Sequence, residues 1–201
     1  MIQPTPKQIK TALLDWLGSD RVVFESGWKT RGRPWTHGLR GVVEHHWAGV
    51  GDGAYLWMQA RDGAYPYCNS AIRRDGKVYV LSALSAWGSG VGGPWPAAGI
   101  PKDLGHLYLW QTEFESWGRT QDFTDGMWEA QALQDCALRE VAGPEAFPNF
   151  RRLINHASWT NGGRDLGLTY NLPTYGRKND TLYPVREFRR RANAAWKTRQ
   201  G

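Results

Sequence analysis

Cysteine is scarce in this chain of 201 residues, and long hydrophobic runs are missing from it. The two cysteines, Cys68 and Cys136, are too few for a disulfide framework, so we expect both to be small buried thiols. No apolar stretch approaches the length needed to cross a bilayer, so no transmembrane segment is expected. The N-terminal residues MIQPTPKQIK lack the apolar region of a secretory signal peptide. These absences favour synthesis in a cytosolic compartment.

Positive charge and tryptophan, by contrast, are abundant. The formal net charge is +6, which favours an anionic partner, and the chain contains 12 tryptophans. Tryptophan stacks on sugars and on bases, and it also fills protein cores. Three interpretations follow: a carbohydrate polymer as partner, a nucleic acid as partner, or a tryptophan-rich core beneath a basic surface.

The N-terminal segment carries the signals of a helix over residues 5–18. Thr5 suits the N-cap, Pro6 suits the first helical position, and Gln8 can complete a capping box with Thr5. Gly18 ends the segment. Apolar residues recur at helical spacing, at Ile9, Leu13, Trp16 and Leu17.

Strand patterns occupy the middle of the chain. The mostly apolar run 39–46 and the segment 107–115 each predict a strand. Residues 68–81 predict a hairpin, because Asp75 and Gly76 form a strong two-residue turn signal between two strand-like runs.

The remaining segments complete a single-domain pattern over residues 1–201. Helices are predicted over 124–141 and about 184–198, the second opened by Pro184. Residues 19–38 are expected to be irregular. The loops 85–106 and 157–182 are long enough to form the walls of a site. We therefore predict one α/β domain with helices packed on a central mixed β-sheet.

Two of the five histidines stand side by side in the stretch EHHWAG, at the end of the predicted strand. Neutral imidazole is the commonest metal ligand, and a catalytic zinc site has three protein ligands and one open position. Adjacent side chains on a strand point to opposite faces, so only one of His45 and His46 can be a ligand. The third ligand could be a carboxylate or a thiolate. The second would come from His37, His106 or His156. The alternative is that each histidine is an ordinary hydrogen-bonded side chain.

Seven short motifs follow one another along about residues 38–190: HHWAG, YCNSAIRRDGKVYVLS, SAWGSGVGG, WQTEFES, FTDGMWEAQ, NHASW and YGRKND. In order and rough spacing they resemble the zinc-dependent N-acetylmuramoyl-L-alanine amidases of the type 2 family, which are related to peptidoglycan recognition proteins. Within that family, the motifs resemble those of endolysins of phages that infect Gram-positive hosts. The resemblance implies hydrolysis of the amide bond between N-acetylmuramic acid and L-alanine in bacterial peptidoglycan.

The resemblance also implies a ligand set and two catalytic groups. His45 matches the first zinc (Zn2+) ligand of the family, His156 the second and Asp180 the third. Glu113 matches a catalytic carboxylate, and Lys178 matches a lysine that can stabilise negative charge. Glu113 would then take a proton from water and pass it to the leaving amine, while zinc and Lys178 would face the developing oxyanion.

The chain departs from the family's pattern in two important places. Residues 160–175 are an insertion at the mouth of the site, and they contain Asp165, a rival for the third ligand. Asp180 is favoured because GRKND keeps the lysine and its spacing. Ala86 stands where relatives have a histidine that contacts substrate, so the substrate contacts must differ.

Several other residues have two interpretations. Glu115 lies on the same strand face as Glu113 and could compete as the base, or it could pair with an arginine. His46 is expected to be a packed or hydrogen-bonded neighbour of the ligand, and His106 a structural or solvent-facing residue. Four tryptophans could line a glycan groove, although at least two should be core: Trp47, Trp87, Trp95 and Trp110. Basic residues of the last helix could attract the anionic cell wall or form a solvated face: Arg186, Arg189, Arg190, Arg191 and Lys197.

Three rival functions remain open beside the amidase. A non-catalytic peptidoglycan-binding module of the same fold would need a broken metal site. A zinc peptidase would cut within the stem peptide. A nucleic-acid binder would need a recognition motif that the sequence lacks, and it would leave the histidines unexplained. We expect a monomer that is made in the host cytoplasm without a signal peptide and acts on the cell wall after release.

Overall fold

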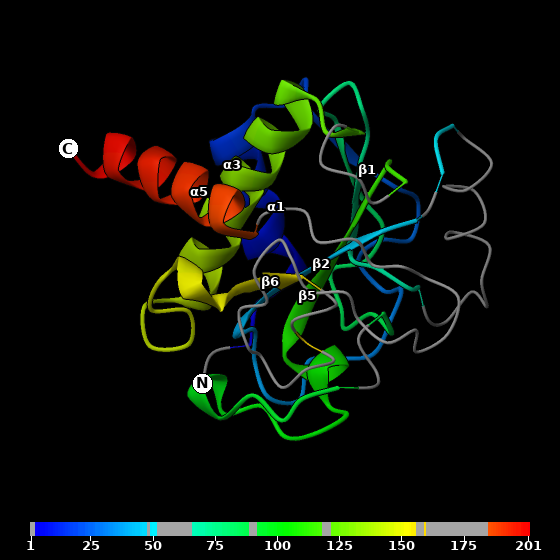
Figure 1. Cartoon of the computed structure of the whole chain (residues 1–201). Helices are drawn as coiled ribbons and strands as arrows, with labels where there is room; N and C mark the ends of the chain where they lie inside the picture. Colours follow the sequence, from blue (N-terminus) through cyan, green and yellow to red (C-terminus); the bar gives the residue numbers. More distant parts are fainter. Residues whose placement is uncertain are drawn as a thin grey trace.

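The molecule is a central β-sheet with helices on one side and loops on the other (Figure 1). The computed structural model describes residues 3–47, 49–51, 66–88, 92–117, 122–155, 159 and 185–201.

The sheet has six strands in the order β1-β4-β3-β5-β2-β6. Strands β3 and β4 are antiparallel, and every other neighbouring pair is parallel. The predicted mixed sheet is therefore confirmed. The strands span Val22–Phe24 (β1), Gly41–His46 (β2), Ser70–Ile72 (β3), Val78–Val80 (β4), Leu109–Phe114 (β5) and Leu153–Asn155 (β6).

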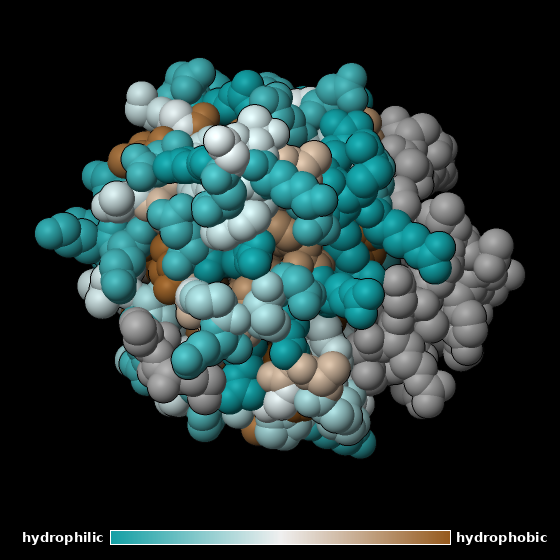
Figure 2. Space-filling model, turned by 90° about the vertical axis from the view of Figure 1, so that its left-hand side faces the viewer, coloured by the Kyte–Doolittle hydropathy of each residue, from teal (hydrophilic) through white to brown (hydrophobic). Residues whose placement is uncertain are grey.

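Three helices cover one face of this sheet: α1 (Pro6–Leu17), α3 (Asp125–Ala142) and α5 (Val185–Gln200). Every second side chain of the central strands points toward them, so Val42, Trp110 and Phe114 join Leu13 and Phe188 in one buried core. Seen from the helix side, the surface is mostly hydrophilic with small scattered apolar areas (Figure 2). None of the described helices is long and apolar enough to cross a membrane.

The helices begin where their capping residues predict. The Thr5 hydroxyl accepts a hydrogen bond from the Gln8 backbone N–H (3.3 Å), and the Gln8 side chain accepts one from the Thr5 N–H (2.9 Å). At α3, the Thr124 hydroxyl accepts from the Met127 N–H (3.2 Å), and Gly143 ends the helix. Pro184, predicted to open α5, lies outside the described residues.

The opposite face of the sheet is covered by irregular chain. Side chains of residues 95–109 pack against the β2 and β6 residues Val43 and Ile154, together with the fully buried Trp159. Trp159 accepts a hydrogen bond at its carbonyl from the Gly93 N–H (2.8 Å), and a Cβ atom at Gly92 would lie 2.6 Å from its ring nitrogen. The tryptophan of the NHASW motif is thus wedged against a glycine pair.

Four details of the sequence prediction were wrong. Residues 19–38 contain strand β1, and β6 was not predicted. The segment predicted as a strand over 107–115 begins as a 3-10 turn and becomes strand only at Leu109. The hairpin turn has three residues, since the Arg73 N–H bonds to the Lys77 carbonyl and the Gly76 N–H to the Arg73 carbonyl. Gly76 adopts a φ of 80°, which suits the last position of such a turn.

Candidate functional site

His45 and Glu113 lie side by side near the carboxyl ends of strands β2 and β5. The two residues are in register on adjacent parallel strands, so both side chains emerge on the loop-covered face of the sheet. Both are buried, with 4% of the surface of His45 and 5% of that of Glu113 exposed. Open α/β sheets bind ligands at the carboxyl ends of their strands, and this pair stands at such an end.

Gln111, two residues before Glu113, shares this face and contacts the histidine. Its Oε1 lies 2.9 Å from His45 Nε2, while its Nε2 donates to the Leu109 carbonyl (2.8 Å). The Gln111 backbone N–H donates to Asn69 Oδ1 (2.9 Å). Gln111 is not among the site residues predicted from the sequence. Its position at i−2 from Glu113 on a strand was the signal that could have found it.

Gly88 brings the loop that follows β4 close to Gln111 and His45. A Cβ atom there would lie 2.5 Å from the Tyr67 carbonyl oxygen, 3.2 Å from Gln111 Oε1 and 3.6 Å from His45 Nε2. Any larger residue would force this backbone away from the histidine. Gly88 of the SAWGSGVGG motif therefore lies beside His45 and Gln111, and the close contacts explain why a glycine stands there.

Trp87 differs from the other tryptophans that were candidates for a glycan groove, because 46% of its surface is exposed. Its indole lies 4.8 Å from the His106 ring and 5.4 Å from the Arg33 guanidinium, and the backbone N–H of Trp87 donates to the Pro66 carbonyl (2.9 Å). The other three are core residues, with exposures of 8% or less, which confirms that at least two would be: Trp47, Trp95 and Trp110.

His46 points to the opposite face of the sheet. It is buried (2% exposed) and in register with Phe114, whose ring belongs to the core beneath the helices. The expectation that only one histidine of the pair faces the site is thus confirmed.

Glu115 is committed to a structural contact. Its carboxylate accepts hydrogen bonds from the Arg73 Nε (3.2 Å), the Arg74 N–H (3.1 Å) and the Gly51 N–H (2.8 Å). These donors tie the β3–β4 hairpin and the segment after β2 to the end of β5. The arginine salt bridge that the sequence analysis offered as its simpler explanation is confirmed.

The remaining histidines and the cysteines have structural surroundings. His37 is exposed and stacks on Tyr108 (4.7 Å between ring centres). His106 is buried beneath Trp87, and burial together with the nearby Arg33 lowers its pKa. Both cysteines are fully buried free thiols, as expected, and burial raises the pKa of Cys136.

The other predicted site residues lie outside the described part of the chain: His156, Asp165, Lys178 and Asp180. Strand β6 ends at Asn155, which is in register with Glu44. These two residues immediately precede His156 and His45 in the sequence. Among the described residues, no group of three histidine, cysteine or carboxylate side chains is arranged to hold a metal ion.

A buried polar layer lies behind the site, on the helix-facing side of the sheet. Gln131 Nε2 donates to Asp135 Oδ1 (2.6 Å) and to Glu44 Oε1 (3.2 Å), so one amide group serves two carboxyl groups. Burial raises the pKa of both acids; the pKa of Glu44 is raised further by Asp135 and lowered by Arg189. This layer joins α3 to the strand that carries His45.

No protein-family model matches the sequence, and no curated protein does. Solved structures do match. The endolysin N-acetylmuramoyl-L-alanine amidase LysCS from Clostridium intestinale URNW matches with a TM-score of 0.53 at 14% identity, over 86% of this chain and 95% of that chain. The N-acetylmuramoyl-L-alanine amidase LysC from the same organism matches with a TM-score of 0.52, also at 14% identity, over 86% and 97% of the two chains.

The chain shares the fold of these amidases. At this level of identity the likeness concerns the fold alone, and it agrees with the α/β domain that the sequence predicts. The match covers most of this chain and nearly all of each amidase, so it extends beyond the central sheet.

Proposed function

We propose that this protein is a zinc-dependent N-acetylmuramoyl-L-alanine amidase that acts as a phage endolysin. The observation that supports this best is the buried pair of His45 and Glu113, in register at the strand ends of an amidase-like fold. A metal ligand and a proton-transfer group must stand close together in such an enzyme, and the pair offers one of each.

His45, His156 and Asp180 would hold the metal. The described part of this set fits, because a buried neutral imidazole with one nitrogen against an amide oxygen can offer its other nitrogen to zinc. Zinc, when bound, lowers the pKa of water and polarises a carbonyl group.

Glu113 would move the proton. It would take one from the attacking water and deliver it to the amine that leaves as the N-terminus of L-alanine. The Glu113 side chain is buried and lies on the same face of the sheet as His45. Lys178 would face the oxyanion of the tetrahedral intermediate.

The proposal includes where the protein is made and where it acts. The protein would be synthesised in the host cytoplasm, would act as a monomer, and would meet peptidoglycan after release to the wall. Two alternatives share the fold or the metal: a non-catalytic peptidoglycan-binding module, and a zinc peptidase that cuts within the stem peptide.

Mass spectrometry of digested cell wall separates these functions. We expect the wild type to release intact stem peptides with a free L-alanine amine and to leave sugar chains uncut. Glu113→Gln should lower the rate by about 10²–10⁴-fold with the fold retained. Exposed His37 supplies the matched control, since His37→Ala should keep full activity. Shortened stem peptides would identify a peptidase, and wall binding without release of products would identify a binding module.

Zinc content tests the ligand set separately. About one zinc per chain should be present in the wild type and in His37→Ala, and lost in His45→Ala, His156→Ala and Asp180→Ala. Asp165→Ala should keep its zinc. Retention in Asp180→Ala with loss in Asp165→Ala would make Asp165 the third ligand.

A further inference from the structure

The hydrogen bonds of Gln111 determine which way its side-chain amide points. The amide is fully buried, and one end lies 2.8 Å from the Leu109 carbonyl oxygen. A carbonyl oxygen only accepts hydrogen bonds, so the NH2 group must be at that end. The amide oxygen is therefore the atom that lies 2.9 Å from His45 Nε2.

This orientation assigns the proton on the histidine. An amide oxygen also only accepts, so a hydrogen bond between the two atoms requires His45 Nε2 to carry the hydrogen. A neutral imidazole has one N–H, and its second nitrogen, Nδ1, then carries the lone pair that a metal ion needs. We propose that Gln111 is a positioning residue that holds His45 as the Nε2–H tautomer and presents Nδ1 as the ligand atom.

Gln111 is itself held from two directions. Its backbone N–H donates to Asn69 Oδ1, and Asn69 donates through Nδ2 to the Ser82 carbonyl (3.1 Å), so the β5 strand is anchored beside the hairpin. The close approach of Gly88 limits the space over the Gln111 oxygen. A glutamine in this setting cannot rotate without losing the Leu109 bond, and the imidazole plane is held with it.

The contact also has an electronic effect. Partners that accept the second N–H of a metal-bound histidine fix its orientation and raise its basicity, and their loss typically weakens metal affinity 10–100-fold. The inference rests on the proposed function, because it concerns the same histidine. It adds a residue that the motif comparison did not assign.

The first test is nuclear magnetic resonance on the metal-free wild-type protein. Long-range ¹⁵N–¹H spectra should show His45 as the Nε2–H tautomer with a slowly exchanging proton. On addition of zinc, that proton should remain and the Nδ1 resonance should shift. A proton on Nδ1, or loss of the Nε2 proton when zinc binds, would overturn the proposal.

The second test is zinc titration of variants. Gln111→Leu should weaken zinc binding about 10–100-fold and abolish the protected Nε2 proton. Gln134 is the matched control, since it is equally buried, donates to Thr112 Oγ1 (2.9 Å) and lies on the other face of the sheet. Gln134→Leu should leave zinc affinity unchanged. Unchanged affinity in folded Gln111→Leu would contradict the positioning role.

These readouts do not depend on wall cleavage. If the protein binds zinc as described but releases no stem peptides, the amidase proposal fails and the role of Gln111 stands. If the protein cleaves the amide but Gln111→Leu binds zinc normally, the amidase proposal stands and the positioning role of Gln111 fails.

Discussion

Trp87 and Trp95 show how two tryptophans near one site can have different tasks. Trp95 is 6% exposed and packs with Ile100 and Trp159 on the loop-covered face of the sheet. Trp87 is 46% exposed, stands next to Gly88 in the sequence, and rests on His106. An exposed indole that is held by its neighbours, next in sequence to the glycine that approaches His45, is suited to stack on a sugar ring.

Alanine substitutions should separate these tasks. Trp87→Ala should raise KM for cell wall severalfold, and it should lower the free energy of unfolding by less than Trp95→Ala does, since about half of the Trp87 surface is exposed. Trp95→Ala should lower the free energy of unfolding by about 3–5 kcal/mol. Urea denaturation and wall-lysis kinetics on both variants measure this, and a normal KM in Trp87→Ala would remove the proposed sugar contact.

At the scale of elements, the start of α3 is tied to the hairpin. The Thr124 hydroxyl caps the helix and also donates to the Arg74 carbonyl (2.8 Å) in the β3–β4 turn. The turn approaches the helix closely, and a Cβ atom at Gly76 would lie 3.0 Å from the Gly126 carbonyl oxygen. One threonine thus holds a helix end and a turn that are distant in sequence.

Thr124→Ala should therefore cost more than the loss of a simple cap. Thr5→Ala, which removes hydroxyl contacts that stay within the capping box with Gln8, should lower the free energy of unfolding by about 1 kcal/mol. Thr124→Ala should cost about 2 kcal/mol, because the hydrogen bond that ties the helix to the distant Arg74 carbonyl is lost as well. Exposed Thr198 near the end of α5 serves as control, and Thr198→Ala should change little. Equal losses at Thr5 and Thr124 would show that the turn contact contributes nothing.

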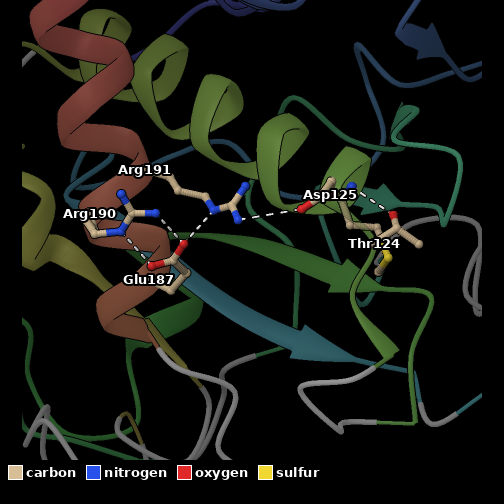
Figure 3. Close-up of polar contacts among 6 residues, drawn as sticks. Thr124, Asp125, Glu187, Arg190 and Arg191 are labelled. Atoms are coloured by element: carbon tan, nitrogen blue, oxygen red, sulfur yellow. Dashed lines mark hydrogen bonds and ion pairs between the residues drawn. The ribbon is translucent and has the colours of Figure 1, made fainter.

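Several arginines of α5 make polar contacts with other residues of the same molecule. Arg189 donates through Nε (3.0 Å) and Nη2 (2.7 Å) to the Leu153 carbonyl, while Arg190 and Arg191 both bind Glu187 (Figure 3). Arg186, Arg190 and Lys197 are exposed. Much of the basic character that the sequence suggested for wall attraction therefore serves to dock and stabilise this helix.

Glu187 makes the stability of α5 sensitive to acid. Hydrogen bonds from Arg190 and Arg191 lower the pKa of its carboxyl group to about 2. A lowered pKa contributes stability that is present above the ordinary pKa and is lost as the pH falls toward about 2. Glu187→Gln should lower Tm at neutral pH, by no more than about 4 °C, with the difference shrinking below about pH 4.5. Thermal unfolding across this range checks it, and a difference independent of pH would exclude the charge as the cause.

At the scale of the whole molecule, buried polar groups connect the helix layer to the sheet. Asp135 is fully buried, and it shares the Gln131 amide with Glu44 from β2. The charge of Arg189 in α5 also interacts with Glu44 and lowers its pKa. Because burial raises the pKa of Asp135, the folded protein holds its proton at a pH where the unfolded chain has released it.

The sign of the resulting pH dependence follows from proton binding. A raised folded pKa means that stability falls as the pH rises above the unfolded value, at most by about 1.4 kcal/mol per pH unit for one proton. Asp135→Asn keeps the shape and removes the titration, so its stability should fall less between pH 5 and 8 than that of the wild type. Asp125→Asn, at a fully exposed aspartate on the same helix, should keep the wild-type slope. Urea denaturation of the metal-free proteins supplies the comparison, and a parallel slope for Asp135→Asn would refute the assignment.

The predicted and the missed elements differ in how local their signals are. Helices α1 and α3 begin at threonines that bond to residues three positions ahead, so their starts could be read from the sequence. Strands β1 and β6 have three residues each and lie at the two edges of the sheet. Runs of three residues are too short to show the alternation of apolar and polar residues that predicts a strand. They form strands because β1 pairs with the backbone of β4 and β6 pairs with the backbone of β2.

The same division applies to the candidate site. The types and order of the chemical groups were readable: a histidine pair, one of which must face away, and a strand with carboxylates at alternate positions. That Glu113 rather than Glu115 stands beside His45 was decided by tertiary structure, since Arg73 and the Gly51 N–H engage Glu115. No local pattern contains the register between β2 and β5.

The sequence by itself determined the class of fold, the helix starts and the chemistry that the site could carry, because these depend on residues a few positions apart. Tertiary structure alone decided that β5 lies between β3 and β2, that Gln111 contacts His45, and which of the four candidate tryptophans stays exposed. Each of these depends on segments that are far apart in the chain and meet only when the sheet and its core form together, so the whole sequence specifies them and no short motif does.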